Sequence, residues 1–416
     1  MKKIALFSSL LVVGLVGAQL LPSLAGDLHA PLLELIGFLT MVGLAFIMIH
    51  VGYEFEIDKG RLRGYAWDYV VAMGTAGLPW VFATLYFLLI LLPSDAWGSW
   101  QAWKETLLMG RFAAPTATGV LFSMLAAAGL SATWMFRKTR ILVIFDDLDT
   151  VLLMIPLKVF MVGLAWQLGA VVIVMFVMLW VAWRWLHRLT IPTSWPWVLT
   201  YAVLIAGASE AIYWGTKVVD YRVPIHLEVL LPAFVLGCVM RRPAGSDPHC
   251  DDGRVGHQEG PESAVEQRVS TLVSGIFMVL VGLTMPPLVG AAVEEAPVAA
   301  GTVSGAQPPL GSGMLAVHVL ALTVLINIGK MVPAFCYRRE ADWKERFAVA
   351  LGMCPRGEVG AGVILLSLDY GITGPMVNVA VFSLALNLLL TPLFIYAVTA
   401  LLRRTEAQRR ASVSPK

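Results

Sequence analysis

Residues 141–162 read ILVIFDDLDTVLLMIPLKVFMV, an apolar run in which Asp146, Asp147 and Asp149 are embedded. The run has the length of a bilayer-spanning helix, which needs about 20 predominantly apolar residues. Ionisable side chains at the centre of such a span are costly, and for that reason they mark candidate functional sites. The stretch therefore predicts a membrane helix that carries acids with a function.

The composition of the whole chain is that of a membrane protein. Of 416 residues, 58% are hydrophobic and 14% are charged, and the mean hydropathy is +0.76. Soluble globular proteins carry about 25% charged residues, so a water-soluble enzyme is excluded. The formal net charge of +2 is too small to indicate nucleic acid as a partner.

Twelve apolar segments follow one another along the chain, and each is expected to be a transmembrane helix. The predicted fold class is an all-α polytopic membrane protein. We divide it into a first transmembrane half at 1–240, a cytoplasmic linker at 241–268, a second half at 269–402 and a cytoplasmic tail at 403–416. The segments cover residues 4–22, 31–53, 66–92, 107–130, 141–162, 165–186, 196–216, 223–240, 270–291, 313–336, 346–368 and 374–401.

The Lys and Arg residues in the connections predict the orientation, because cytoplasmic loops are enriched in them. With both termini in the cytoplasm, most basic residues fall on the cytoplasmic side, and the opposite side receives Lys104, Lys217 and Arg222. The protein is therefore expected in the cytoplasmic (inner) membrane as a multi-pass protein. The first segment has the alternative of a cleaved signal peptide. Four basic residues fall within spans: Arg111, Lys158, Lys330 and Arg356.

The three acids in the fifth segment are close enough to interact. On a helix Asp146 and Asp147 are adjacent, and Asp149 lies on the same side as Asp146. Carboxylates this close in a low dielectric do not all ionise unless a cation is present, so protons and metal ions should compete for them. This competition is the chemistry of cation/proton exchange. In the alternative, Asp149 in particular lies in a cytoplasmic funnel as a solvated acid.

Lys330 lies in the tenth segment, in the run Leu325-Ile-Asn-Ile-Gly-Lys330. A buried ammonium group needs a carboxylate partner, and Asp146 or Asp147 can supply it. In the alternative, the long side chain extends to the membrane interface and keeps its charge in water.

Two segments carry matching interruptions. The fourth contains Pro115, Thr116 and Thr118, and the eleventh contains Pro355-Arg-Gly-Glu358. The carbonyl groups freed by proline and the threonine hydroxyls are ligands of the kind that coordinate Na⁺ in broken transporter helices, although a simple proline kink is the alternative. The two segments run in opposite directions, which is the arrangement expected of inverted-repeat transporters.

Taken in this order, the motifs resemble the monovalent cation:proton antiporter superfamily, especially its second branch, the sodium/proton exchangers. The resemblance runs from about residue 31 to residue 402 and includes Val51-Gly-Tyr-Glu54, the Asp146-Asp147 pair, Lys330 and Pro355-Arg-Gly-Glu358. It implies crossed broken helices in a core domain that moves against a dimerisation domain, and hence a homodimer. It also implies that more than one proton is exchanged per cation.

The resemblance also assigns roles to residues of the site. Asp147 binds the monovalent cation or the proton, and Asp146 pairs with Lys330. From their own charges, which can neutralise the ends of the half-helices, Arg356 and Glu358 are expected to set structure or gating. Two residues depart from the pattern and their roles stay open: Asp149 stands where relatives have small or apolar residues, and His50 precedes Glu54 by one helical turn.

The function expected from the sequence is secondary antiport of Na⁺ or Li⁺, with K⁺ as a further candidate, against protons by alternating access. Such a protein would serve pH homeostasis without a cofactor, and its partners would be the two ions and the lipid bilayer. One alternative is a potassium efflux system or channel-like K⁺ transporter. Another is an intramembrane enzyme in which Mg²⁺ bridges the acids to a diphosphate, but that needs a second acidic cluster, which the other segments do not offer.

Overall fold

The protein is described by a computed structural model that covers residues 2–55, 62–131, 133–163, 166–219, 229–241, 264–285 and 303–413. Helices dominate these residues, and no strand occurs among them apart from an isolated bridge between Leu189 and Met240. The expected all-α fold class is confirmed in this part of the chain. The predicted linker at 241–268 lies mostly outside the described residues.

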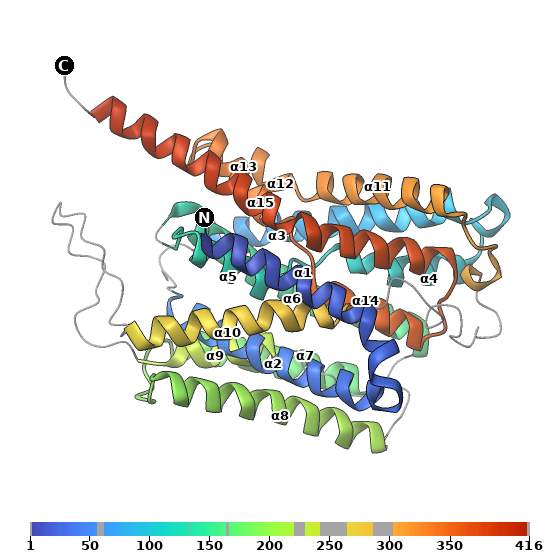
Figure 1. Ribbon diagram of the computed structural model, residues 1–416, viewed down its shortest axis with the longest axis horizontal. Coiled ribbons are helices and arrows are strands. Elements are labelled where there is room, and N and C mark those ends of the chain that lie inside the picture. The colour runs from blue at the N-terminus through green and yellow to red at the C-terminus, as the bar shows by residue number, and fades with distance from the viewer. Residues whose placement is uncertain are drawn as a thin grey trace. The chain divides into compact units, whose positions relative to one another are not determined.

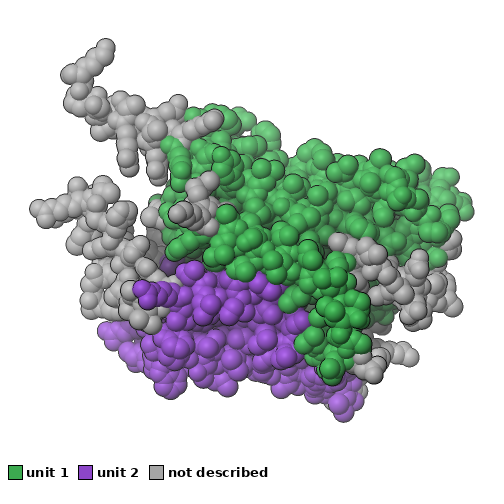
Figure 2. Space-filling model, viewed as in Figure 1, with its two compact units in different colours: residues 1–33, 59–163, 281–416 green, residues 34–58, 164–280 purple. Residues whose placement is uncertain are grey.

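The chain divides into two compact units that interleave along the sequence (Figure 2). Unit 1 comprises Met1–Leu33, Lys59–Gly163 and Val281–Lys416. The predicted halves 1–240 and 269–402 therefore each contribute to both units. The helices of unit 1 are α1 (Lys2–Ala25), α3 (Leu62–Tyr86), α4 (Trp100–Gly110), α5 (Thr118–Ala127), α6 (Trp134–Val162), α11 (Ser312–Gly329), α12 (Val332–Phe335), α13 (Trp343–Gly352), α14 (Glu358–Asp369) and α15 (Pro375–Val413).

Unit 2 comprises Glu34–Asp58 and Leu164–Leu280. It contains most of α2 (His29–Tyr53) and of α10 (Ala264–Leu283), together with α7 (Trp166–Arg184), α8 (Trp195–Val219) and α9 (Leu230–Val239). Its connection between α7 and α8 is held by His187, whose ring nitrogens lie 3.0 Å from the carbonyl oxygens of Met240 and Phe55.

Seven helices in the described part of the chain are long and apolar enough to cross a membrane. They coincide with the first, second, third, sixth, seventh, tenth and twelfth predicted segments. The other five predicted segments do not form a single helix that is both long enough and apolar enough to be counted among these seven. The fourth and eleventh are each split into two half-helices, α6 carries several charged side chains, and the eighth and ninth correspond to shorter apolar helices.

Helix α6 begins at Trp134, seven residues before the start predicted for its span. Thr133 caps the helix, because its hydroxyl accepts a hydrogen bond from the Phe136 amide at 3.2 Å. The additional helical turns contain Lys138. Because of this charge, the sequence analysis placed them in a loop outside the span. Asp68 neutralises this lysine at 3.0 Å and Glu340 at 2.9 Å. The predicted boundary was wrong because a paired charge is compatible with a buried helix.

Tyr337 completes this cluster of Asp68, Lys138, Tyr337 and Glu340. The phenol donates to Asp68 at 2.7 Å, and the Lys138 ammonium lies 4.4 Å from the centre of the Tyr337 ring. Burial and the nearby Asp68 raise the pKa of Tyr337, so the phenol remains a donor at neutral pH. The cluster ties α3 and α6 to the turn between α12 and α13.

Replacing the central lysine, Lys138→Met, is expected to destabilise the protein by about 2–3 kcal/mol, because two carboxylates lose a charged hydrogen-bond donor. The measurement is the thermal unfolding midpoint of the purified protein in detergent. Arg339→Met is the control, since Arg339 is exposed in the same turn and its loss should leave the midpoint unchanged. An unchanged midpoint in Lys138→Met would contradict a stabilising role for the cluster.

Helix α11 packs against α3 (Figure 1), and Gly329 at its end lies against Pro79 of α3. A Cβ atom added at Gly329 would lie 2.8 Å from the backbone nitrogen of Pro79, inside van der Waals contact. The close approach places the next residue, Lys330, beside α3 and α6.

Gly329→Ala should therefore destabilise the protein by about 1–3 kcal/mol through overpacking. Gly77→Ala on α3 is the matched control, because nothing lies within 4 Å of a Cβ added there. Loss of a helical glycine at that open position should be neutral or stabilising. Equal unfolding midpoints for the two variants would show that the contact with Pro79 does not limit the approach of α11.

Candidate functional site

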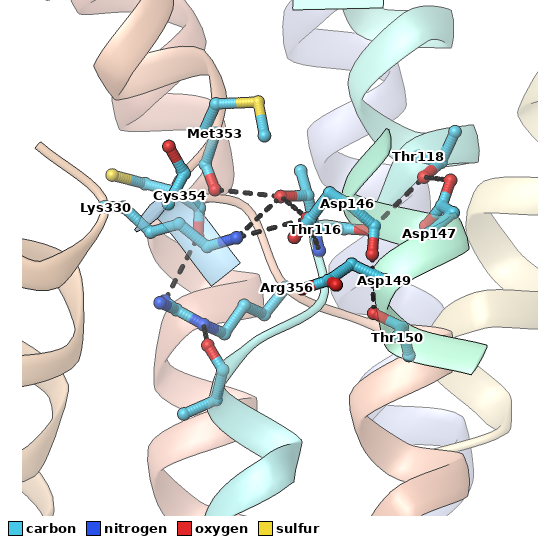
Figure 3. Close-up of polar contacts among 12 residues, drawn as sticks. Thr116, Thr118, Asp146, Asp147, Asp149, Thr150, Lys330, Met353, Cys354 and Arg356 are labelled. Carbon is cyan, nitrogen blue, oxygen red and sulfur yellow. Dashed lines mark hydrogen bonds and ion pairs between the residues drawn. The ribbon is translucent and has the colours of Figure 1, made fainter. Parts of the chain in front are cut away.

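The two interrupted segments of unit 1 meet at their unwound parts (Figure 3). The amide of Ala117 donates to the carbonyl of Pro355 at 2.8 Å, and the Thr116 hydroxyl lies 3.2 Å from the carbonyl oxygen of Met353. The Ala117 amide and the carbonyl groups of Pro355 and Met353 lie in the unwound stretches, where the half-helices end and offer no helical partner. The predicted pair of interruptions is thus present, and the polar groups at one interruption form hydrogen bonds with those at the other.

Proline and glycine explain where the half-helices end and begin. Pro115 and Pro355 lack the amide that a continuing helix requires. Helix α5 begins at Thr118, and α14 begins at Glu358 after Gly357. Glu358 lies in the first turn of α14, where a carboxylate stabilises the positive end of the helix dipole. The simple kink considered for Pro115 does not describe the structure, since the helix is fully interrupted.

Asp146 and Lys330 form an ion pair at the crossing, with Nζ and Oδ2 separated by 3.2 Å. Both side chains are 0% exposed, so the alternative in which Lys330 extends to the membrane interface does not hold. Thr116 lies between them (Figure 3): its amide and hydroxyl donate to the same Asp146 oxygen at 3.0 and 2.8 Å, and its hydroxyl oxygen accepts from Lys330 at 3.0 Å. Asp146 is therefore neutralised within the protein.

Asp147 has different surroundings from Asp146. It is partly buried, and it accepts a hydrogen bond from the Thr118 hydroxyl at 2.9 Å. The two threonines predicted to bind a cation thus each contact one acid of the pair. The ion pair with Lys330 is thus made by the first acid of the pair, Asp146.

Asp149 is buried, with 2% of its surface exposed, so it is not the solvated acid of the alternative interpretation. Its backbone carbonyl accepts a hydrogen bond from the guanidinium of Arg111 at 3.0 Å. Arg111 follows the end of α4 and is itself fully buried. The sequence had placed Arg111 within a span but had given it no role in the site.

Arg356 is buried and holds the crossing together through its guanidinium. Its Nε donates to the carbonyl of Ala113 at 2.7 Å, which joins the second interruption to the first. The remaining donors reach two further helices, at Asn327 and Ile326 on α11 and at Asn387 on α15, and the carbonyl of Cys354 in the same unwound stretch. These contacts agree with the structural role predicted for Arg356. The predicted role in gating stays a prediction.

A polar ladder between α11 and α15 was missed in the sequence. Thr323 and Ser383 share a hydrogen bond of 2.8 Å, and Asn327 donates to Asn387 at 2.8 Å. On each helix the two polar residues are four positions apart, which places them on one face. This spacing within apolar segments was the signal that could have identified them.

His50 lies in unit 2, whereas the acids lie in unit 1. Its Nδ1 is 2.9 Å from the Phe46 carbonyl oxygen, and its ring packs against the Phe46 ring. No group of three His, Cys, Asp or Glu side chains suited to a metal ion occurs among the residues that the structure describes.

Comparison with known proteins places this site in a family. The transmembrane region of sodium/hydrogen exchangers matches residues 2–400. The chain belongs to the sodium/hydrogen exchanger family. The match includes both interruptions, the acids of α6 and Lys330, and it confirms the resemblance drawn from the sequence. Family membership supports cation:proton antiport by this exchanger and does not indicate an enzyme.

The fold of the exchanger is similar to a solved structure of the sodium proton antiporter MjNhaP1 from Methanocaldococcus jannaschii at pH 8. The TM-score is 0.52 at 14% sequence identity, and the similarity covers 93% of this chain and 91% of that chain. At this level of identity the comparison shows a shared fold. A search of curated proteins found no match.

Proposed function

We propose that this exchanger moves a monovalent cation, Na⁺ or Li⁺ first and K⁺ as a further candidate, out of the cell in exchange for protons moving inward. The proposal rests on the difference between the surroundings of Asp146 and those of Asp147. Asp146 is fully buried and paired with Lys330, whereas Asp147 is partly buried and accepts a hydrogen bond from the hydroxyl of Thr118.

Asp147 can bind either ion but not both at once. As a carboxylate it attracts a cation, and as a carboxylic acid it does not, so binding of one species requires release of the other. The unwound segments bring further oxygen ligands close by, including the Thr118 hydroxyl and the Thr116 carbonyl, which lie 3.3 Å apart. Hard alkali cations favour such ligands in broken transporter helices.

Alternating access would carry this site from one side of the membrane to the other. In the proposal, unit 1 is the moving core, because it contains both interrupted helices, and unit 2 is the dimerisation domain of a homodimer. The exchanger lies in the cytoplasmic membrane with both termini inside and contributes to pH homeostasis.

The test is cation-driven proton movement in proteoliposomes that contain the purified protein and a pH-sensitive dye. An imposed pH gradient should dissipate after addition of Na⁺ or Li⁺, and to a degree to be measured after K⁺, but not after choline. Absence of any response to all three alkali cations would overturn the proposal. Cation flux that continues without proton counterflow would instead favour the channel-like potassium transporter.

A further inference from the structure

A histidine of unit 2, outside the site described so far, joins the ends of two helices. His187 lies in the connection that follows α7, and its ring is partly buried. Nδ1 lies 3.0 Å from the carbonyl oxygen of Met240, the C-cap residue of α9. Nε2 lies 3.0 Å from the carbonyl oxygen of Phe55, two residues after the end of α2. Both ring nitrogens therefore face acceptors.

The number of protons on the ring decides how many of these carbonyl groups it can bind. A carbonyl oxygen accepts hydrogen bonds and cannot donate them. A neutral imidazole carries one N–H group, whereas the imidazolium form carries two. Only the charged ring of His187 therefore donates to Met240 and Phe55 together. In the neutral ring a nitrogen lone pair faces one of the two carbonyl oxygens, and that hydrogen bond is lost.

The position of the ring also suits a positive charge. The carbonyl groups at the C-terminal end of a helix form the negative end of the helix dipole, which stabilises a nearby cation. The ring bridges the C-terminal ends of α2 and α9, and His187 itself follows Arg184, the last residue of α7, by three positions. Three negative helix ends thus lie next to one titratable ring.

The backbone around His187 is fixed to the end of α9. Its φ angle is +53°, which is uncommon for a residue other than glycine and requires support from the surroundings. The His187 amide donates to the carbonyl of Cys238 at 2.9 Å. The Leu189 amide donates to Val239 at 2.9 Å, and the Leu189 carbonyl accepts from the Arg241 amide at 2.8 Å. The main chain therefore ties the connection to α9, and the ring adds the end of α2.

The two helix ends that the ring joins are in direct contact. A Cβ atom added at Gly237 of α9 would overlap the backbone of α2 at Ile49. A Cβ atom added at Gly52 of α2 would overlap the backbone of α9 at Phe234. The rings of Phe55 and Phe234 pack edge to face with 5.2 Å between their centres. Interfaces packed this closely transmit displacements, so the state of the ring affects the position of the end of α2.

The other charged groups of these elements are exposed to solvent. On the connection they are Arg184 and Arg188, after α9 Arg241, and at the end of α2 Glu54. Water and salt screen exposed charges, so these groups compete little with the two carbonyl contacts. The remaining titratable side chains of the described residues there are Tyr53 and Cys238, residue types that ordinarily titrate above about pH 8. The ring of His187 is thus the group that changes charge near neutral pH.

We propose that His187 is a pH-sensitive staple of unit 2 that slows exchange when the cytoplasm is acidic. In the orientation proposed above, the ends of α2, α7 and α9 that it joins face the cytoplasm. Histidine changes charge between about pH 5 and 8. The charged ring holds the end of α2, and the chain passes from unit 2 to unit 1 four residues after Phe55. The neutral ring releases one helix end, so unit 1 moves more freely.

The direction of the response suits the exchange. An exchanger that brings protons into the cell acidifies the cytoplasm, and the staple closes as the cytoplasmic pH falls. Import of protons therefore stops before it becomes harmful. The inference rests on the function proposed above and adds its regulation.

The main experiment compares initial rates of sodium-driven exchange in proteoliposomes between variants and wild type at two pH values. His187→Asn is neutral at every pH and tolerates the positive φ angle. Because one hydrogen bond to a charged group changes an equilibrium about tenfold or more, the ratio of the His187→Asn rate to the wild-type rate should be about ten at about pH 6. At about pH 8.5 it should be about one, since the histidine is then neutral. Competition of protons at Asp147 affects both proteins and cancels in the ratio.

A permanently charged variant should give the opposite result. His187→Arg keeps its positive charge at every pH, so its rate relative to the wild type should be about one at about pH 6 and about one tenth at about pH 8.5. Arg188→Gln is the matched control, because it removes an exposed positive charge next to the staple and should equal the wild type at both pH values. A ratio for His187→Asn that does not change with pH would overturn the inference. A merely structural histidine would lower the amount of folded protein and leave this ratio constant.

A second measurement does not depend on transport or on the folding of His187→Asn. Hydrogen exchange of the purified wild-type protein reports the protection of the Leu189 and Arg241 amides, whose hydrogen bonds fix the connection to α9. After correction for the intrinsic exchange rate, their protection should fall about tenfold between about pH 6 and about pH 8.5. Constant protection would overturn the staple. Absence of sodium-driven exchange in a wild type that shows this fall would instead overturn the proposed function.

Discussion

Asp147→Asn is expected to abolish cation-driven proton flux while leaving the fold intact. Asparagine has nearly the same shape and can still accept the hydrogen bond of the Thr118 hydroxyl, which lies 2.9 Å from the native carboxylate. It carries no negative charge and binds no proton at neutral pH. Flux should therefore fall at least about 100-fold, the equivalent of about 2.7 kcal/mol of lost stabilisation.

The measurement is the initial rate of dye response in proteoliposomes, normalised to the amount of inserted protein. Asp95→Asn serves as the control, because Asp95 is an exposed acid in the short helix that precedes α4, and it should transport like the wild type. If Asp147→Asn retains half of the wild-type rate, Asp147 is not the exchanging acid and the proposed function loses its main support.

Lys330→Met should have the largest effect on stability. Methionine matches the length of the side chain but leaves Asp146 buried without its counter-ion, since both groups are 0% exposed. Breaking a buried ion pair by removing one partner costs about 3–5 kcal/mol. The unfolding midpoint in detergent should fall accordingly, and the remaining protein should show weakened exchange.

The double variant Asp146→Asn with Lys330→Met separates the charge from the packing. It removes both members of the pair, so no unpaired buried charge is left, and replacement of a whole buried pair is often close to neutral. We expect most of the lost stability to return. A double variant that is no more stable than Lys330→Met would show that packing around the lysine, and not the unpaired carboxylate, determines the loss.

The parts of the site that could be predicted from the sequence are those whose residue types conflict with a lipid environment. Acids at 146 and 147, a lysine at 330 and prolines at 115 and 355 are recognisable because each interrupts an apolar helix. Their order along the chain was specific enough to identify the family. The helix boundaries were less predictable, since Lys138 and its partners conceal the start of α6 within a charged stretch.

The contacts between distant segments could not be predicted. From the residues alone either acid could partner Lys330, and the structure pairs it with Asp146. The hydrogen bond between Ala117 and Pro355 joins positions more than 200 residues apart. Arg111 was visible as a charge within a span, but its relation to Asp149 depends on how α4 packs against α6.

Arg356 places a positive charge of the chain itself at the crossing of the two interrupted helices. Unwound helix ends present carbonyl oxygens, and a dissolved cation could occupy them. Here a guanidinium that is part of the chain occupies those at Ala113, Ile326 and Cys354. A tethered charge neither dissociates nor competes with dissolved salt. The crossing therefore carries its own positive charge at carbonyl groups of both interruptions, Ala113 in the first and Cys354 in the second.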